Sequence, residues 1–434
     1  MVNINLNNEN LWKWMAICPK NGNKKTLNDY IKLIADNQAN SGYITKLKKE
    51  YFNEKSSNDI MRNLSLFVPR EYFLELQFCA KTIASMFGTI FPPLISHIDQ
   101  LAYIEWLLYT EPGYTKSRDH LVHMFKVAFV GDRLLSNNNI LEKICELQFE
   151  AEHFKEWSKD SKFNIYLTNE NDQKDIVKMA FILASVFHDF GYGYFFHNLY
   201  QGRLFKINKW LQPGSDLTDI DTPFFEKFKK SLPYFYIEQK HKWGIKSKTF
   251  INEEQKKRLI SGFFRDCLPL NHSIASTFTI LDIAERLWDS GALNEKLYVS
   301  FQLAAEAIMI HDMTERKNWM HLDYKKKKHF LDNQSYKSIP IAILLILADV
   351  LAVWNRFKMK SKHSGNNEEI TYQIDNEYVP KEIDIEILDK KIIIKPIYKT
   401  PKEKRYYENY DVLGKKFQKD LAHLYQPFFE YADI

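Results

Sequence analysis

One nearly all-apolar segment constrains the fold of this chain more than any other feature. Residues 174–189 are predicted to form a helix with apolar side chains on almost every side, and such a helix is buried all round. Gly191 and Gly193 follow it and mark its end. The segment closes on His188 and Asp189, two ionisable residues that are costly to bury unless another group compensates them. A bound metal ion is the obvious compensating group.

Four other segments repeat apolar residues at helical spacing and carry a His or Asp on the apolar stripe. They are residues 118–135, 272–288, 296–311 and 340–356. The polar residues on their stripes are His123, His272, His311 and Asp349. For any one of these histidines, a hydrogen-bonded core position is the simpler interpretation. The ordered set of six residues, spread over five helices, favours a ligand set instead.

The chain as a whole is predicted to be mainly α-helical. Glycine and proline are sparse, 14 of each in 434 residues. The expected parts are an N-terminal helical region over 1–100, a core over 101–360 with an insertion at about 197–262, and a small α+β element over 361–434. In the last part, residues 382–388 alternate strictly and 391–398 resume after a short turn, which predicts a β-hairpin. A closing helix is expected over residues 412–429.

Composition excludes several classes of protein. A net charge of +5, with 26% charged and 45% hydrophobic residues, is an ordinary globular balance; nucleic acid stays compatible as a partner but is not indicated. The four cysteines are scattered and predict neither a zinc knuckle nor a disulfide framework. The apolar stretch 339–354 contains Asp349 and is too short to cross a bilayer. Because the first residues do not form a secretory signal, we expect a cytoplasmic protein without a membrane partner.

The residue types of the six-residue set suit divalent metal ions. Imidazole nitrogen and carboxylate oxygen are ligands for Mn, Fe, Zn or Mg, and a carboxylate such as that of Asp189 can bridge two ions. His123, His188 and Asp349 would complete one metal site, and His272 and His311 the other. Two ions roughly 3.5–4 Å apart can activate a hydroxide and clamp the oxygens of a phosphoryl group.

Five short blocks of the sequence resemble the HD-domain metal-dependent phosphohydrolases. The blocks are RDHLVHMFKV (118–127), FHDFGY (187–192), NHSIAS (271–276), AIMIHD (307–312) and LADVLAVWNR (347–356). The resemblance covers about residues 100–360 and implies an HD-domain helical bundle. It also implies that His123, His188, Asp189 and Asp349 are the four-ligand set, with His272 and His311 the extra histidines of two-metal members. The chain departs from the pattern of bacterial members at Asn271, where they tend to have Asp, and at Asp312, where they tend to have Asn.

The resemblance implies hydrolysis of a phosphoester or phosphoanhydride bond by a metal-activated hydroxide. The expected substrate is a small phosphorylated molecule, preferably a nucleotide, and the expected catalytic residues are Asp189 and, as general acid, His120. Arg118 and Arg356 are candidates for bidentate phosphate binding, and Tyr192 for lining the pocket. The alternative for the two arginines is a structural salt bridge, and for Tyr192 it is packing of its ring. His120 could instead have a merely polar role.

Two other functions stay open at this point. A helical module stabilised by a metal could hold a nucleotide without turning it over, as a sensor. The same six ligands could also hold two irons in an HD oxygenase. Product formation separates the sensor from the hydrolase, and iron content with oxygen consumption identifies the oxygenase.

Overall fold

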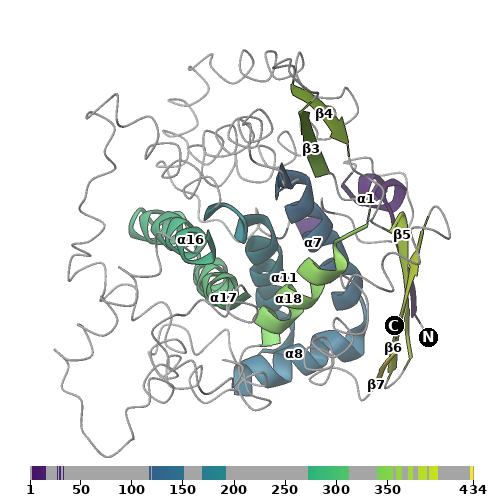
Figure 1. Ribbon diagram of the computed structural model, residues 1–434. Helices are drawn as coiled ribbons and strands as arrows, with labels where there is room; N and C mark the ends of the chain where they lie inside the picture. The colour runs from purple at the N-terminus through teal and green to yellow at the C-terminus, as the bar shows by residue number, and fades with distance from the viewer. Residues whose placement is uncertain are drawn as a thin grey trace, which may run out of the picture. The chain divides into compact units, whose positions relative to one another are not determined.

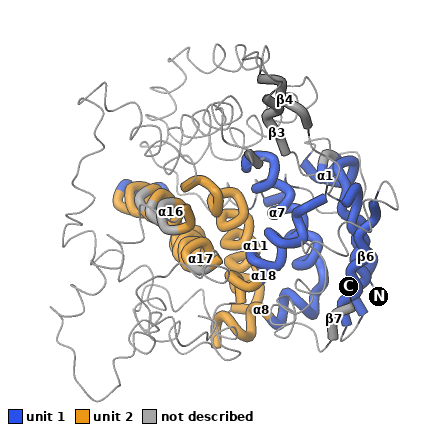
Figure 2. The backbone as a smooth tube through the Cα atoms, in the orientation of Figure 1, with its two compact units in different colours: residues 1–143, 290–292, 344–434 blue, residues 144–289, 293–343 orange. Residues whose placement is uncertain are grey.

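The computed structural model describes part of the chain, and this part falls into two compact units. Unit 1 comprises Met1–Lys143, Ser290–Ala292 and Leu344–Ile434, and unit 2 comprises Ile144–Asp289 and Leu293–Ile343 (Figure 2). The residues described are 2–15, 27, 29, 30, 33, 117, 118, 120–150, 169–191, 272–311, 340–354, 358–363, 370–374, 380–388, 391–398 and 431–433. Both units contain buried apolar residues of their own.

Helices dominate the described residues (Figure 1). Seven helices make up most of this part, which confirms, for the described residues, the prediction of a mainly α-helical fold. The helices are α1 (Asn8–Met15), α7 (His120–Leu135), α8 (Asn138–Glu150), α11 (Glu170–Phe187), α16 (His272–Asp289), α17 (Glu295–His311) and α18 (Pro340–Leu351). All five helices predicted around the candidate ligands are present, although α18 ends at Leu351 and not at residue 356. The predicted insertion at 197–262 and the closing helix at 412–429 lie outside the described residues.

A four-stranded sheet in unit 1 joins the two ends of the chain. Its order is β1-β5-β6-β7, with β1 (Val2–Leu6), β5 (Glu382–Ile387), β6 (Lys391–Ile397) and β7 (Tyr431–Asp433). β5 and β6 form the predicted hairpin, and its alternating pattern places Ile383, Ile385 and Ile387 on the buried face. Within the predicted helical N-terminal region, residues 2–6 are a strand that pairs antiparallel with β5, whereas Asn8–Met15 form the helix α1.

A second sheet in unit 1 has three antiparallel strands in the order β2-β3-β4. They are β2 (Ser117–Arg118), β3 (Lys358–His363) and β4 (Ile370–Ile374). Arg118 pairs with Lys358 in this sheet and not within a helix, so α7 begins two residues later than the sequence predicts. This sheet was not predicted.

The core of unit 1 is built on α7, in which every residue except Arg133 is buried. The ring of Phe129 lies between two tryptophan rings, with centroids 5.5 Å from Trp14 of α1 and 6.3 Å from Trp354 in the turn after α18. All three side chains are at most 1% exposed. Aromatic pairs at these separations stabilise a core beyond the area that they bury.

Unit 1 also contains a buried polar pair. The phenol of Tyr30 donates a hydrogen bond to the Asp132 carboxylate of α7, and both side chains are buried. Burial raises the pKa of Tyr30 well above its ordinary value, and the negative charge of Asp132 raises it further. The neutral phenol is therefore the form that the fold stabilises.

In unit 2, α11 packs along α17, and α17 also packs along α16. Asn169 caps α11, because its side-chain oxygen accepts hydrogen bonds from the backbone N–H groups of Asn171 and Asp172. The Ser300 hydroxyl of α17 donates to the Ile176 carbonyl of α11 over 3.3 Å. Of the helices among the described residues, none is long and apolar enough to cross a membrane.

The Tyr30 phenol gives a prediction on the pH dependence of stability. Because its pKa is raised in the fold, Tyr30 contributes stability that is fully present below the unfolded pKa of about 10 and is lost as the pH rises through the folded value. We expect Tyr30→Phe to lower the free energy of unfolding at pH 7 by about 1–3 kcal/mol, since the Asp132 carboxylate loses this donor. The difference from wild type should shrink above pH ~10.

Urea unfolding of both chains between pH 7 and 11 measures this difference. The comparison isolates Tyr30 because the other 23 of the 24 tyrosines titrate in both chains. A difference that stays constant up to pH 11 would contradict the raised pKa.

Candidate metal centre

Three helix ends meet at one place in unit 2. α11 and α17 run parallel, since Ser300 bonds to Ile176 near their starts while the rings of His188 and His311 lie 5.2 Å apart at their ends. α16 runs antiparallel to α17, as the hydrogen bond from the Thr277 hydroxyl to the Ala305 carbonyl indicates. The first residue of α16 therefore lies beside the last residue of α17.

This arrangement gathers four of the six predicted ligands. They are His188, Asp189, His272 and His311, and all four are buried. His188 is the C-cap of α11, Asp189 follows it, His272 begins α16 and His311 ends α17. The rings of His272 and His311 have centroids 5.4 Å apart. Residues that are 123 positions apart in the sequence thus form one cluster, which we call the unit 2 cluster.

The Asp189 carboxylate lies between two imidazoles of the unit 2 cluster. Its Oδ1 is 3.4 Å from Nε2 of His188 and also 3.4 Å from Nε2 of His272. These separations are longer than the ~2.7–2.9 Å of a charge-assisted hydrogen bond. Two ligand atoms at ~2.1 Å from one ion in tetrahedral geometry are separated by about 3.4 Å. The spacing around Asp189 therefore fits metal ligands better than it fits direct hydrogen bonds.

Backbone carbonyls select the tautomer of two of the histidines. Nδ1 of His188 lies 2.7 Å from the Ser185 carbonyl oxygen, and Nδ1 of His311 is hydrogen-bonded to the Ile308 carbonyl. A carbonyl only accepts, so Nδ1 carries the proton in both rings, and Nε2 is the nitrogen that could bind an ion. One ligand atom each from His188, Asp189 and His311 lie within 4.8 Å of one another. The donor set, its spacing and its tautomers all fit a divalent ion.

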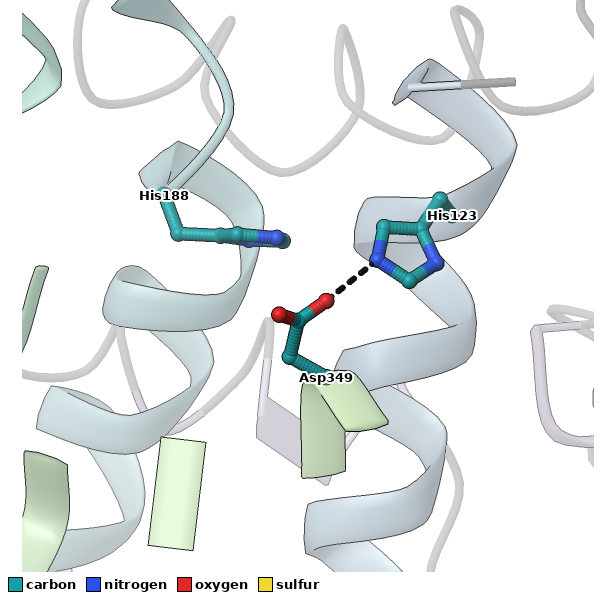
Figure 3. Close-up of side chains that lie close together, drawn as sticks. All are labelled: His123, His188 and Asp349. Carbon is teal, nitrogen blue, oxygen red and sulfur yellow. Dashed lines mark hydrogen bonds and ion pairs between the residues drawn. The ribbon is translucent and has the colours of Figure 1, made fainter. Parts of the chain in front are cut away.

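The other two predicted ligands, His123 and Asp349, contact each other within unit 1. Nε2 of His123 lies 2.6 Å from Oδ1 of Asp349, the hydrogen bond drawn as a dashed line in Figure 3. The His123 side chain is buried, whereas that of Asp349 is 35% exposed. Because 2.6 Å is shorter than the spacing of two ligands on one ion, this hydrogen bond would have to lengthen for both residues to bind the same ion.

The end of α18 is tied to α7 by a buried lysine. The Lys126 ammonium donates a hydrogen bond to the Trp354 carbonyl over 3.2 Å and lies 5.8 Å from the centroid of the Trp354 ring. Lys126 is one turn after His123, and Trp354 is five residues after Asp349. Lys126 thus connects the turn after α18 to α7, the helix that carries His123. Both contacting residues are close in sequence to a member of the His123–Asp349 pair.

The remaining predicted site residues are placed as follows. His120 is the first residue of α7, buried and three residues before His123. Arg118 lies in β2, where only its backbone is described. Tyr192 and Arg356 lie outside the described residues.

Sequence reasoning missed two residues that build the surroundings of these groups, Ser276 beside the unit 2 cluster and Lys126 in unit 1. A lone serine or lysine within a helix carries no sequence signal for such a role. No protein-family model matches the chain, and neither does a curated protein or a solved structure. The resemblance to HD-domain phosphohydrolases therefore depends on the short blocks of residues alone.

Gly191 provides a test of how closely the cluster is packed. A Cβ atom at this position would lie 1.8 Å from the His272 carbonyl oxygen and 2.8 Å from the Ser276 backbone nitrogen. Backbone atoms of α16 cannot yield without moving the helix, so we expect Gly191→Ala to lower the free energy of unfolding by about 3 kcal/mol, the upper end of the usual cost of overpacking.

Gly291→Ala is the matched control. Gly291 has φ +68° and no atom within 4 Å of the added Cβ, so only the left-handed backbone opposes alanine, at about 1–2 kcal/mol. Denaturant unfolding measures both variants. A cost for Gly191→Ala no larger than that for Gly291→Ala would contradict the close contact with α16.

Proposed function

We propose that this protein is a metal-dependent hydrolase of the HD type that cleaves a phosphoester or phosphoanhydride bond, preferably in a nucleotide. The observation that carries the proposal is the unit 2 cluster, in which three helices bring three histidines and one aspartate together in a buried place. Burial of a carboxylate among imidazoles is costly without a compensating charge, and a divalent ion provides that charge.

The ligand types narrow the choice of ion. Imidazole nitrogens with a carboxylate oxygen suit Mn, Fe or Zn, while a site for Mg alone would be built from oxygens. A bound divalent ion supplies an electrophile that lowers the pKa of water and neutralises charge on phosphoryl oxygens. His188, Asp189, His272 and His311 are the residues of unit 2 that would hold it. The resemblance implies that His123 and Asp349 would be further ligands and that a second ion would bind.

Protein side chains supply the remaining chemistry in this proposal. His120 is buried at the start of α7, and we assign it the transfer of a proton to the leaving oxygen. The fork of a guanidinium matches two phosphate oxygens, which makes Arg118 and Arg356 the candidates for holding the substrate. Tyr192 directly follows Gly191 in the sequence and is the candidate for ring contact with a nucleobase.

The proposal predicts a stoichiometric divalent metal in the purified protein. Elemental analysis should find at least one ion per chain, and His188→Ala combined with Asp189→Ala should remove it. A screen of phosphorylated metabolites with Mn or Fe supplied would measure phosphohydrolase activity. In the double variant this activity should be about 10²–10³-fold lower than in wild type, because several kcal/mol of transition-state stabilisation are lost.

Ser300→Ala is the control for this experiment, because Ser300 is buried in the same unit on α17 and its hydroxyl donates hydrogen bonds to the backbone carbonyls of Ile176 and Lys296. It should keep both metal and activity. Metal-free wild-type protein, or a double variant with full activity, would refute the hydrolase. Thermal stabilisation by nucleotides without product would support a sensor, and iron-dependent oxygen consumption would support an oxygenase.

A further inference from the structure

The serine missed by sequence reasoning, Ser276, lies one helical turn after His272 on α16 and is fully buried. Its hydroxyl makes two hydrogen bonds to the backbone of the turn that ends α11. It donates to the His188 carbonyl oxygen over 2.7 Å and accepts from the Gly191 N–H over 2.7 Å. One side chain thus bonds to the chain on both sides of Asp189.

These two backbone groups belong to the end of α11, where a helix leaves its last carbonyls without intrahelical partners. His188 is the C-cap, and the Phe190 N–H bonds back to the Phe187 carbonyl over 3.1 Å, which closes the turn. Buried backbone groups must be paired, so the Ser276 hydroxyl takes the place that water has at an exposed helix end. The turn can lie this close to α16 only because residue 191 is glycine.

We propose that Ser276 is a positioning residue for metal binding, which sets the separation between Asp189 and His272. Asp189 is carried by the turn that Ser276 bonds at both ends, and His272 is on the same helix as Ser276. The hydroxyl therefore connects the two backbones whose side chains stand 3.4 Å apart at Asp189 Oδ1 and His272 Nε2. The hydroxyl acts through the backbone and is not a ligand itself, and this inference rests on the proposed function.

The test uses Co²⁺ or Zn²⁺ alone as the probe, on the full chain stripped of metal. Residues that hold a metal ligand in place without binding the ion themselves typically change metal affinity by about 10–100-fold when removed. We expect Ser276→Ala to weaken Co²⁺ binding by about this factor and to shift the visible absorption of the bound ion. Ser300→Ala removes the same group from an equally buried serine of α17 and should change the affinity by less than about three-fold.

A pair of variants with nearly equal shape separates the hydroxyl from packing. Ser276→Thr keeps the hydroxyl and Ser276→Val replaces it with a methyl group, so any effect of added volume is shared. The threonine variant should bind Co²⁺ more tightly than the valine variant by about ten-fold. Thermal unfolding of the metal-free chains shows how much of each change is general destabilisation.

Several outcomes overturn the inference. Each of three results would show that the hydroxyl does not position ligands. Ser276→Ala could keep the wild-type Co²⁺ affinity, or Ser276→Ala and Ser300→Ala could lose the same amount of Co²⁺ affinity. The third is equal Co²⁺ affinity of the threonine and valine variants. A Ser276→Ala chain that fails to fold while Ser300→Ala folds would make Ser276 a general element of the fold. Wild-type protein that binds neither ion refutes the proposed function as well, whereas the other outcomes leave that function standing.

Discussion

The burial of His188 and Asp189 at the end of α11 is the constraint on which the structure of unit 2 depends. A helix that is apolar on almost every side must be surrounded by other helices, and its last carbonyls must then find partners inside the protein. The Ser276 hydroxyl of α16 pairs with the His188 carbonyl, and the His188 ring pairs with the Ser185 carbonyl. In the same turn, the Asp189 side chain lies close to His272 and the His188 ring lies close to His311. One arrangement of the turn therefore both pairs its buried carbonyls and brings the side chains of the cluster together.

His188 and His311 solve the same local problem in the same way. Each stands at the carboxyl end of its helix, and each directs Nδ1 at the carbonyl three residues earlier, Ser185 in α11 and Ile308 in α17. This hydrogen bond pairs a carbonyl that has no intrahelical partner at the helix end. It also fixes the orientation of the ring and its tautomer. Because α11 and α17 are parallel and end together, two rings oriented by their own helices arrive at one place.

The sequence predicted the helices and the β5–β6 hairpin because their signals are local and periodic. β1 was missed although VNINL alternates, since five residues are a short signal and the partner strand β5 lies about 380 positions away. Four of the six candidate ligands come together in unit 2, and the other two contact each other in unit 1, a grouping that the positions of these residues in the sequence did not predict. The roles of Ser276 and Gly191 were not predictable, because they arise from the approach of two backbones that no sequence period records.

The two groups of predicted ligands differ in how readily they could take an ion. In the unit 2 cluster, Asp189 Oδ1 stands 3.4 Å from two imidazole nitrogens, already at the separation that ligands on one ion require. In unit 1, His123 and Asp349 form a direct hydrogen bond of 2.6 Å that an ion bound by both would replace. An ion would therefore need little rearrangement to bind at the unit 2 cluster, whereas binding at the unit 1 pair would first have to offset the loss of a hydrogen bond. If the protein binds metal as proposed, this difference would make the turn that carries His188 and Asp189, together with Ser276, the place where affinity for the first ion is determined.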